Sequence, residues 1–504
     1  MPSQTHNSIE VCSPKLSEIL LGLGIGDAEV VEKQHIKYLD VYLLSIGAKC
    51  AIIEHEYVDR DYLEDYTRYY SRCFKAYKRE CVRVHFFSKG YSADEINRAL
   101  INEDGTGRAL IQESYLGFVV LRPLQRTIIG RTCLLPYAES NGRHYKALCD
   151  VPVSFFGVQL NVLCMPFQEQ DSTVAACATC ALWSAFQVTA NYFKHAVYTP
   201  GRITELATSH GLSSVRSLPN GSGLTINDVL YAVRHVGLDP VVVRANNEVA
   251  GTSVILGNVY SYLGLGISVV VLGDIVNAEG EKKGGHAITV NGYHLAANHN
   301  GRACASSKLR AGLIDKLYVH DDQMGPYARA EIQDDGVCGR WLLKHDDAHY
   351  QMELVKIFVP KYLIIPVYQK IRVIYDEVWT CAYEFDRIIC VLPELHGAME
   401  WDITLRASNC IKGLVRQEAV IPSEERLRFL TTGLPKYVWE LTLFYNGTKW
   451  AMFCIDATDS GQGLNVAASI FYSPELPDMI TALCKAVPSL GYKPLCRACV
   501  RSSQ

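Results

Sequence analysis

Hydrophobic and polar positions recur with two different periods along this chain, and together they predict both helices and strands. Between residues 59 and 83, mainly aromatic residues recur at the helical spacings of three and four: Tyr62, Tyr66, Tyr69, Tyr70, Cys73 and Tyr77. Short apolar runs predict buried strands, for example over 116–121, where Arg122-Pro123 ends the run. The mixture predicts an α+β fold.

The middle of the chain follows the order of helices first and strands afterwards. A helix is expected to begin at Cys177, and another over 224–236, where Ser222 or Thr225 is the expected cap. A third helix is expected over 254–263. The expected strands cover 239–243, 267–272, 287–293 and 316–320. This order is typical of an α+β domain in which a helix packs on an antiparallel sheet.

The last third of the chain carries the clearest turn signal. Asn446-Gly447 lies between two alternating apolar runs, over 437–445 and 449–456, and this pattern predicts a hairpin with a type I′ turn. Residues 423–431 are expected to form a helix. Residues 353–367 are rich in β-branched and aromatic residues, with Pro360 and Pro366 as expected interruptions.

The length of 504 residues is too great for one ordinary core, so two or three domains are expected. We expect an N-terminal α+β domain of unknown role over 1–155. The candidate catalytic groups all fall in an expected domain over 156–340. An accessory α+β domain is expected over 341–504. The two flanking domains are candidates for contact with a regulatory protein partner.

Composition narrows the classes of function. The net charge of −4 gives no electrostatic basis for a nucleic-acid partner, and the longest apolar runs are too short for a membrane span. The N-terminus lacks the basic and apolar regions of a signal peptide. The eighteen cysteines are scattered through apolar segments, as buried thiols in a reducing compartment are. We therefore expect a cytoplasmic protein.

Cys177 is the candidate nucleophile. It opens a run whose apolar face continues through Leu182, Ala185 and Phe186, so it should lie in the first turn of a helix. A free thiol titrates at about pH 8.5, and a helix N-terminus or a neighbouring imidazolium favours the reactive thiolate. Cys180 in the same helix is interpreted as a buried core thiol.

His286 and Asp321 are the candidate base and orienting carboxylate. His286 follows Gly284-Gly285, which would permit close approach of the backbone, and strand alternation places it with apolar companions. Asp321 ends the next expected strand, on the same face as Leu317 and Val319, with Asp322 as the alternative. A thiol, an imidazole and a carboxylate are the components of a cysteine hydrolase.

Acyl transfer also needs hydrogen-bond donors for the oxyanion that develops on the substrate. The backbone N–H of Cys177 is one candidate. Gln170 is the preferred side-chain donor, and Gln168, two residues earlier, is the alternative.

These residues together resemble the papain-like cysteine peptidases, and within them the bacteriocin-processing, double-glycine leader peptidases and their stand-alone relatives. That family has a Gln, a Cys that opens a helix, a His-Ala-(Val/Ile)-x-Val-x-Gly-Tyr strand and an Asp at the end of the next strand. Gln170, Cys177, the segment from His286 to Tyr293, and Asp321 match these positions in that order. The resemblance covers about residues 165–330. It implies a papain-like central domain and a peptidase that acts on peptides or proteins through a thioester acyl-enzyme, without a cofactor.

Two alternatives to a peptidase remain open, and a zinc site is a third but weaker interpretation. The same thioester serves deamidases, isopeptidases and acyltransferases. A papain-like domain could instead be catalytically inactive and act as a binding or regulatory module. Cys496 and Cys499 have the spacing of zinc ligands, but they lack the second pair that a structural zinc site needs, so no metal is expected.

Overall fold

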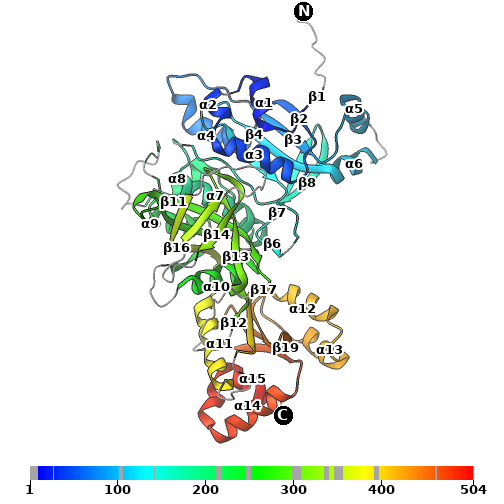
Figure 1. The fold of residues 1–504 in the computed structure, drawn as a ribbon, viewed down its shortest axis with the longest axis vertical. Coiled ribbons are helices and arrows are strands. Elements are labelled where there is room, and N and C mark those ends of the chain that lie inside the picture. Colours follow the sequence, from blue (N-terminus) through cyan, green and yellow to red (C-terminus); the bar gives the residue numbers. More distant parts are fainter. Residues whose placement is uncertain are drawn as a thin grey trace, which may run out of the picture.

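The structure of the chain is a computed structural model. It describes residues 9–25, 28–101, 106–140, 142–171, 173–210, 218–219, 221, 223–245, 251–297, 308–333, 340–344, 356–390, 395, 397–459 and 463–502. Three large sheets follow one another along the longest axis of the molecule (Figure 1). Helices accompany each sheet, and nearly all strand pairs are antiparallel, so the predicted α+β class is confirmed.

The N-terminal sheet has the strand order β1-β2-β3-β4-β5. Its strands are β1 (Glu10–Cys12), β2 (Cys50–Tyr57), β3 (Cys81–Phe87), β4 (Tyr115–Leu121) and β5 (Ile129–Leu134). The helices of this part are α1 (Leu16–Leu23), α2 (Ala28–Val31), α3 (Gln34–Ser45), α4 (Arg60–Arg68), the 3₁₀ turn η1 (Tyr70–Arg72), α5 (Ala93–Ile101) and α6 (Thr106–Ser114). A separate hairpin packs against β4 and β5 and shares their apolar core; its strands are β7 (Cys149–Phe155) and β8 (Val158–Cys164).

The single helix predicted over 59–83 is wrong in its second half. Helix α4 ends at Arg68, and residues 81–87 form strand β3. The helical spacing of the tyrosines reflects a packed aromatic cluster, since Tyr70 contacts both Tyr62 and Tyr77 with ring centroids 6.1 and 5.0 Å apart. The aromatic periodicity therefore continues beyond the end of the helix that it marks.

The central sheet has eight strands. They are β6 (Arg143–Tyr145), β9 (Leu238–Arg244), β10 (Val269–Val276), β11 (Lys282–Leu295), β13 (Ile314–Asp321), β14 (Gly325–Gln333), β15 (Arg340–Lys344) and β16 (Lys356–Tyr368). The path β10-β11-β13-β14-β15-β16 closes on itself, because β16 also pairs with β10. Helix α7 (Cys177–Phe193) packs on β10, β11 and β13 of this ring.

The other helices of the central part are α8 (Pro200–Ala207), α9 (Ile226–His235) and α10 (Gly251–Leu263). The predicted helices over 224–236 and 254–263 are therefore confirmed, and so are the strands expected over 239–243, 267–272, 287–293 and 316–320. Thr225 caps α9 with a capping box, while Ser222 lies outside the described residues.

Strand β16 runs through both of its prolines, which do not interrupt it. Pro360 lies opposite Gly273, where the register with β10 shifts, and Pro366 lies opposite Pro240 of β9. The register shift in β10 and the proline of β9 accommodate residues that have no N–H to donate. Residues 353–355 of the predicted segment lie outside the described part of the chain. Since β16 belongs to the central sheet, that sheet extends beyond the predicted boundary at 340/341.

The C-terminal sheet has the order β12-β17-β18-β19-β20. Its strands are β12 (Lys308–Leu309), β17 (Met399–Ala407), β18 (Tyr437–Tyr445), β19 (Thr448–Asp456) and β20 (Val466–Phe471). The surrounding helices are η2 (Arg310–Leu313), α11 (Tyr375–Ile389), α12 (Ser408–Gln417), α13 (Ser423–Thr431), α14 (Glu475–Ala486), η4 (Pro488–Tyr492) and α15 (Pro494–Ser502). Asn446 and Gly447 have φ angles of 46° and 77°, which confirms the type I′ hairpin.

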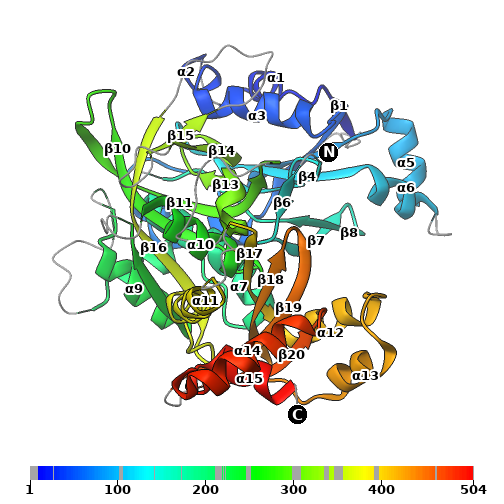
Figure 2. The same ribbon diagram turned by 60° about the horizontal axis from the view of Figure 1, so that its bottom comes forward.

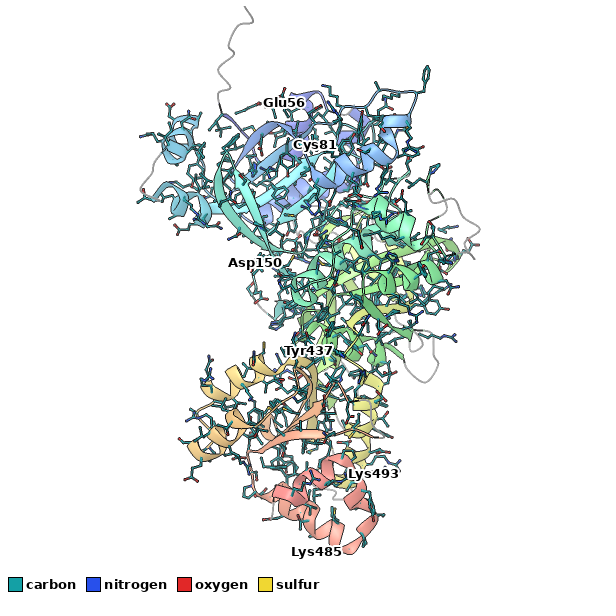
Figure 3. All side chains as sticks on the ribbon, turned by 180° about the vertical axis from the view of Figure 1, so that it is seen from behind. Glu56, Cys81, Asp150, Tyr437, Lys485 and Lys493 are labelled. Carbon is teal, nitrogen blue, oxygen red and sulfur yellow. The ribbon has the colours of Figure 1, made fainter. Side chains whose placement is uncertain are left out.

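An aromatic cluster joins the central and C-terminal sheets. Phe193 at the end of α7 stacks on Tyr368 of β16 with ring centroids 5.4 Å apart, and both rings contact Tyr437 of β18. Figure 3 labels Tyr437 at this junction, and Lys485 at the far end of the molecule. Helix α10 adds a hydrogen bond of 2.6 Å from the hydroxyl of Ser261 to the carbonyl oxygen of Ile403 in β17.

Helix α4 joins the N-terminal part to the central helices through buried carboxylates. The indole N–H of Trp183 in α7 donates a hydrogen bond of 3.0 Å to Asp61, which also lies 3.3 Å from Arg131 of β5. Asp65 accepts a hydrogen bond of 2.9 Å from the N–H of Gly201 at the start of α8. Helix α7 is thus held from both sides, by the central sheet and by α4.

Candidate active site

Cys177 is the first residue of α7, as the sequence pattern predicts. The preceding residue, Ala176, is extended and makes no side-chain cap, and within the described residues no side chain bonds to the N–H groups of the first helical turn. Leu182, Trp183 and Phe186 fix the helix in the core, while Cys177 itself is half-buried. The thiol therefore lies where the helix dipole favours negative charge and where solvent or a substrate can reach it.

His286 lies in β11, beside Gly273 of β10. Its ring meets Phe358 edge to face, with centroids 6.3 Å apart. Both faces of this strand are buried, so the alternation of apolar residues does not by itself determine where the imidazole points. A Cβ added at Gly284 or Gly285 would meet nothing within 4 Å, so the space beside these glycines is open and no close contact requires them.

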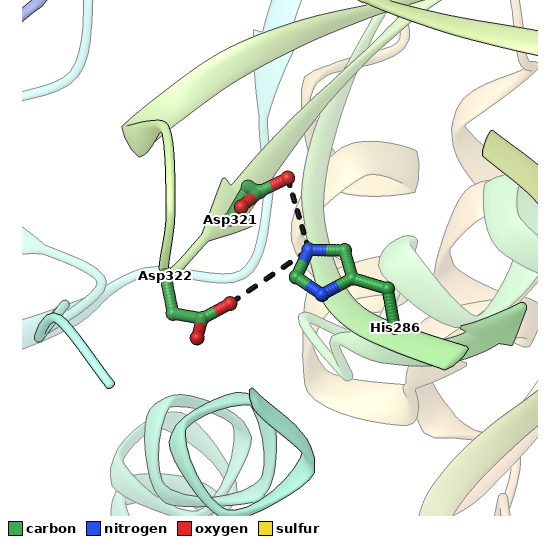
Figure 4. Close-up of side chains that lie close together, drawn as sticks. All are labelled: His286, Asp321 and Asp322. Carbon is green, nitrogen blue, oxygen red and sulfur yellow. Dashed lines mark ion pairs between the residues drawn. The ribbon is translucent and has the colours of Figure 1, made fainter. Parts of the chain in front are cut away.

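Asp321 ends β13, and its carboxylate lies against the imidazole of His286 (Figure 4). Its Oδ2 lies 3.1 Å from Nε2 of His286, while Oδ1 of Asp322 lies 3.7 Å from the same nitrogen. The other oxygen of Asp321 accepts hydrogen bonds from the N–H groups of Gln323 and Met324, at 2.9 and 3.2 Å. These two backbone donors fix the carboxylate in the orientation that faces His286.

Burial and charge oppose each other at this site. Burial disfavours the charged imidazole, but the carboxylate of Asp321 and hydrogen bonds with Asp321 and Cys177 raise the pKa of His286 well above its ordinary value. Burial acts against the charge of Asp321 too, yet the His286 charge holds the pKa of Asp321 well below its usual range. The site therefore favours an imidazolium paired with the carboxylate of Asp321, and interaction with Cys177 acts in the same direction.

Asp322 has a different environment from Asp321. It is fully buried, and burial together with the neighbouring Asp321 charge raises the pKa of Asp322 to about 7, although His286 acts in the opposite direction. Neither of its oxygens has a hydrogen-bond partner among the described residues. Asp322 is thus a second buried carboxylate at the site, and its negative charge is poorly compensated.

A small cavity lies beside Cys177, with a volume of about 10 Å³. Gln168, Cys180 and Asp322 line it together with Cys177. Gln168 is only 4% exposed, and its Nε2 has no hydrogen-bond partner in the described part of the chain. A volume of this size accepts about one oxygen atom of a water or a substrate. The side-chain amide of Gln168, a donor without a partner, and the thiol of Cys177 therefore border the same cavity.

Gln170, the preferred donor on sequence grounds, does not line this cavity. It is half-buried in the segment that leads to α7, and Gln168 takes the position beside the thiol. Gln168 directly follows the buried residues Met165, Pro166 and Phe167, and this apolar context is the sequence signal that distinguishes it from Gln170. Burial of Cys180 raises the pKa of its thiol well above the ordinary value, as expected of a core residue.

His286, Asp321 and Asp322 are also the described residues whose ligand atoms group as a metal site would need, all within 4.8 Å of one another. One imidazole and two carboxylates are suitable ligands for a divalent cation. Cys496 and Cys499 lie in α15. Burial, and then the nearby thiols of Cys484 and Cys381, raise the pKa of the Cys496 thiol to about 12. The sulfur atoms of Cys496 and Cys499 do not form such a group, and the described cysteines are free thiols.

In comparisons with known proteins, no family model and no curated sequence matches this chain. Among the described helices, none is both long and apolar enough to cross a membrane.

Proposed function

We propose that this chain is a thiol-dependent acyl-transfer enzyme, a cysteine peptidase of papain-like type. The arrangement that carries the proposal is the buried imidazole of His286, which forms an ion pair with Asp321 at 3.1 Å and whose pKa is also raised by interaction with Cys177 at the start of α7. A helix that begins with the thiol and packs on antiparallel strands that hold the imidazole and the carboxylate is consistent with this type of fold.

In the proposed reaction, the sulfur of Cys177 attacks the carbonyl carbon of a peptide bond, and negative charge develops on the carbonyl oxygen. The amide N–H of Gln168 and the backbone N–H of Cys177 stabilise that oxygen, which fits the cavity beside the thiol. The imidazolium of His286 then gives its proton to the departing amine, and a thioester remains on Cys177.

Hydrolysis of the thioester completes the cycle. His286, now neutral, removes a proton from a water molecule that attacks the thioester carbon. The bond to sulfur breaks, and the thiolate of Cys177 and the imidazolium of His286 are restored. Asp321 keeps the imidazole oriented through both halves of the reaction and stabilises its charge. We expect the enzyme to work in a reducing compartment such as the cytoplasm, where a catalytic thiol stays reduced.

The substrate must approach from the exposed side of Cys177, because the cavity on the inner side holds little more than one oxygen atom. A peptide or protein carbonyl presented in an extended segment meets this requirement. An isopeptide bond or a glutamine side chain offers the same carbonyl, so the leaving group distinguishes a peptidase from a deamidase.

A second candidate function follows from the small size of the same cavity and from the poorly compensated Asp322. A closed site with an extra buried carboxylate is also what a catalytically inactive binding module would show, and the group of His286, Asp321 and Asp322 could then hold a divalent cation. The reactivity of the thiol separates the two candidates.

The test compares Cys177 with another thiol of the same molecule. Cys410 is exposed and serves as an internal reference for an ordinary cysteine. With limiting iodoacetamide at neutral pH, mass spectrometry should show Cys177 alkylated about tenfold faster than Cys410 or more. The substitution His286→Ala should remove this advantage. The measurement is repeated after a chelator has removed any bound metal ion. If Cys177 reacts no faster than Cys410 in either measurement, the proposal is wrong.

Activity on mixed peptides gives the second readout. The native chain should release new amino termini from a synthetic peptide library, and Cys177→Ala should release none. Release of ammonia without new termini would identify a deamidase instead.

A further inference from the structure

The outermost strand of the C-terminal sheet has an open edge. Strand β20 pairs with β19 on one side, and within the described residues no strand pairs with its other side. Most of its residues are only partly buried, unlike those of β18 and β19. An open edge offers a row of unpaired N–H and C=O groups to another strand.

Two adjoining hollows follow β20 along its length. The first has a volume of about 270 Å³ and lies along residues 464–469, between α13 and α15. The second has a volume of about 400 Å³ and lies along residues 470–472, and Glu425 borders both. Figure 2 shows α13 in orange and the red helices α14 and α15 around this end of the sheet. We call the two hollows together the edge groove.

The pairing with β19 shows which groups face the edge groove. The N–H of Tyr472 bonds to the carbonyl of Trp450, and Ile470 and Ala468 pair opposite Met452 and Cys454. Because backbone groups alternate in direction along an antiparallel strand, the N–H and C=O groups of Ser469 and Phe471 point away from β19. At about 3.3 Å per residue, β20 (Val466–Phe471) can accompany roughly six residues of an extended peptide.

The first hollow is positively charged. Arg428 of α13 and Arg497 and Arg501 of α15 line it, and Glu425 is the acidic residue among its lining side chains. Glu425 lies 3.6 Å from Arg428, which leaves the other two guanidinium groups without an acidic partner in this hollow. This end of the edge groove therefore favours carboxylates in whatever lies along the strand.

Most of the residues that line the second hollow are apolar, and Glu425 and Asp478 are the acidic residues among them. Val420 is 78% exposed at its rim, and Phe471, Pro474 and Pro477 line it. An exposed valine beside two prolines and an aromatic ring gives a surface that an apolar side chain would cover. The edge groove thus combines unpaired backbone groups, an arginine end and an apolar end.

We propose that the edge groove binds an extended peptide segment of a partner protein, which adds to β20 as a further strand. The segment has acidic side chains at the end beside Arg428, Arg497 and Arg501, and apolar side chains at the end beside Val420 and Phe471. Main-chain hydrogen bonds with Ser469 and Phe471 provide affinity, and the two hollows provide selectivity. This binding goes beyond the proposed peptidase activity and does not depend on it.

The test uses two fluorescein-labelled peptides and fluorescence anisotropy with the full chain. Each peptide contains eight residues in which valine and threonine alternate. One peptide has three aspartates at its C-terminal end and the other has them at its N-terminal end, because the added strand can run parallel or antiparallel to β20. One of the two should bind, and its counterpart with three lysines should bind about tenfold more weakly or worse. In hydrogen exchange, the amides of Ser469 and Phe471 should become protected in the complex.

Methylation of peptide nitrogens tests the strand geometry without changing the protein. Only one edge of an added peptide strand meets β20, so only every second N–H of the peptide bonds to it. N-methyl groups on those residues should weaken binding about tenfold or more, whereas N-methyl groups on the alternate residues should weaken it by less than about threefold. Equal effects of both sets would overturn the added strand. So would failure of both acidic peptides to bind, or binding of inorganic phosphate but of neither peptide.

Charge reversal tests the arginine end. Arg501→Glu should weaken binding of the acidic peptide about tenfold. The matched control is Lys485→Glu, which makes the same charge change at an exposed residue of α14 outside the edge groove, and it should leave binding unchanged. Equal weakening by both variants would show only a general charge effect and would overturn the assignment. Cys177→Ala should bind the peptide as the native chain does, so this test is independent of catalysis.

Discussion

The Nε2 atom of His286 lies 3.1 Å from Oδ2 of Asp321, and this pair is buried in the central sheet. The charge of Asp321 is a main reason why the pKa of His286 is raised despite burial. A histidine with a raised pKa contributes stability at low pH, and this contribution is lost as the pH rises through the folded-state value. Protonation of His286, the candidate base, is therefore coupled to the stability of the folded chain.

Asp321→Asn should lower activity about a hundredfold or more, because the imidazole loses the charge that orients and stabilises it. The pKa of His286 should also fall, and an NMR titration of its ring measures this directly. The control is Asp322→Asn, which removes the more distant carboxylate and should have a smaller effect on both quantities. Equal losses in the two variants would contradict the assignment of Asp321 as the orienting group.

Gln168→Ala should lower kcat about a hundredfold, with little change in KM, if its unpaired amide stabilises the oxyanion. Gln170→Ala provides the comparison, because Gln170 was the preferred donor on sequence grounds but lies outside the cavity beside Cys177. We expect Gln170→Ala to leave kcat within about threefold of the native value. The reverse order of effects would show that the donor is Gln170 after all.

Asp322→Asn should change how stability depends on pH. The folded chain keeps a proton on Asp322 up to a pKa of about 7, whereas an unfolded aspartate loses it near pH 4. Between these values the folded state binds more protons, so native stability falls as the pH rises. The variant is neutral throughout and escapes this loss. Its free energy of unfolding should gain on the order of 3 kcal/mol over the native chain between about pH 4.5 and pH 8.

Urea unfolding at about pH 4.5, 6 and 8 measures this difference. A constant offset between the two proteins across the three pH values would mean that the carboxyl group of Asp322 does not titrate in the folded state. The accompanying change in the rate of Cys177 alkylation shows whether relief of the Asp322 charge also affects the thiol.

Local patterns predicted many of the elements well. The Asn446-Gly447 turn, the helix over 423–431 and the Thr225 cap are all determined by residues that are neighbours in the sequence, and each is present in the structure. Order along the chain also sufficed to propose Cys177, His286 and Asp321, because each belongs to a recognisable local segment. In the structure Asp321 lies 3.1 Å from His286, and Cys177 is the first residue of α7.

Non-local packing accounts for what the sequence did not predict. The tyrosine periodicity extended past the end of α4 because the rings form a cluster that continues into the following loop. The position of Gln168 rather than Gln170 in the cavity depends on how the segment before α7 packs, and the pairing of β16 with β10 depends on closure of the ring of strands. The edge groove arises from helices and a strand that are distant in the sequence.

Asp61→Ala should destabilise the chain, because this buried carboxylate joins helix α7 to strand β5 of the N-terminal sheet. It accepts the hydrogen bond of Trp183, in the helix that begins with Cys177, and pairs with the buried part of Arg131 in the N-terminal sheet. Its loss removes a carboxylate that pairs with both Arg60 and Arg131, and removal of one partner from a buried ion pair costs about 3–5 kcal/mol. Thermal and urea unfolding should both show this loss. Asp61→Asn retains an acceptor for the Trp183 indole but not the charge, so it should lose less. If Asp61→Ala slows Cys177 alkylation as strongly as Asp321→Asn does, then the contact with α4, and not only the central sheet, positions the thiol.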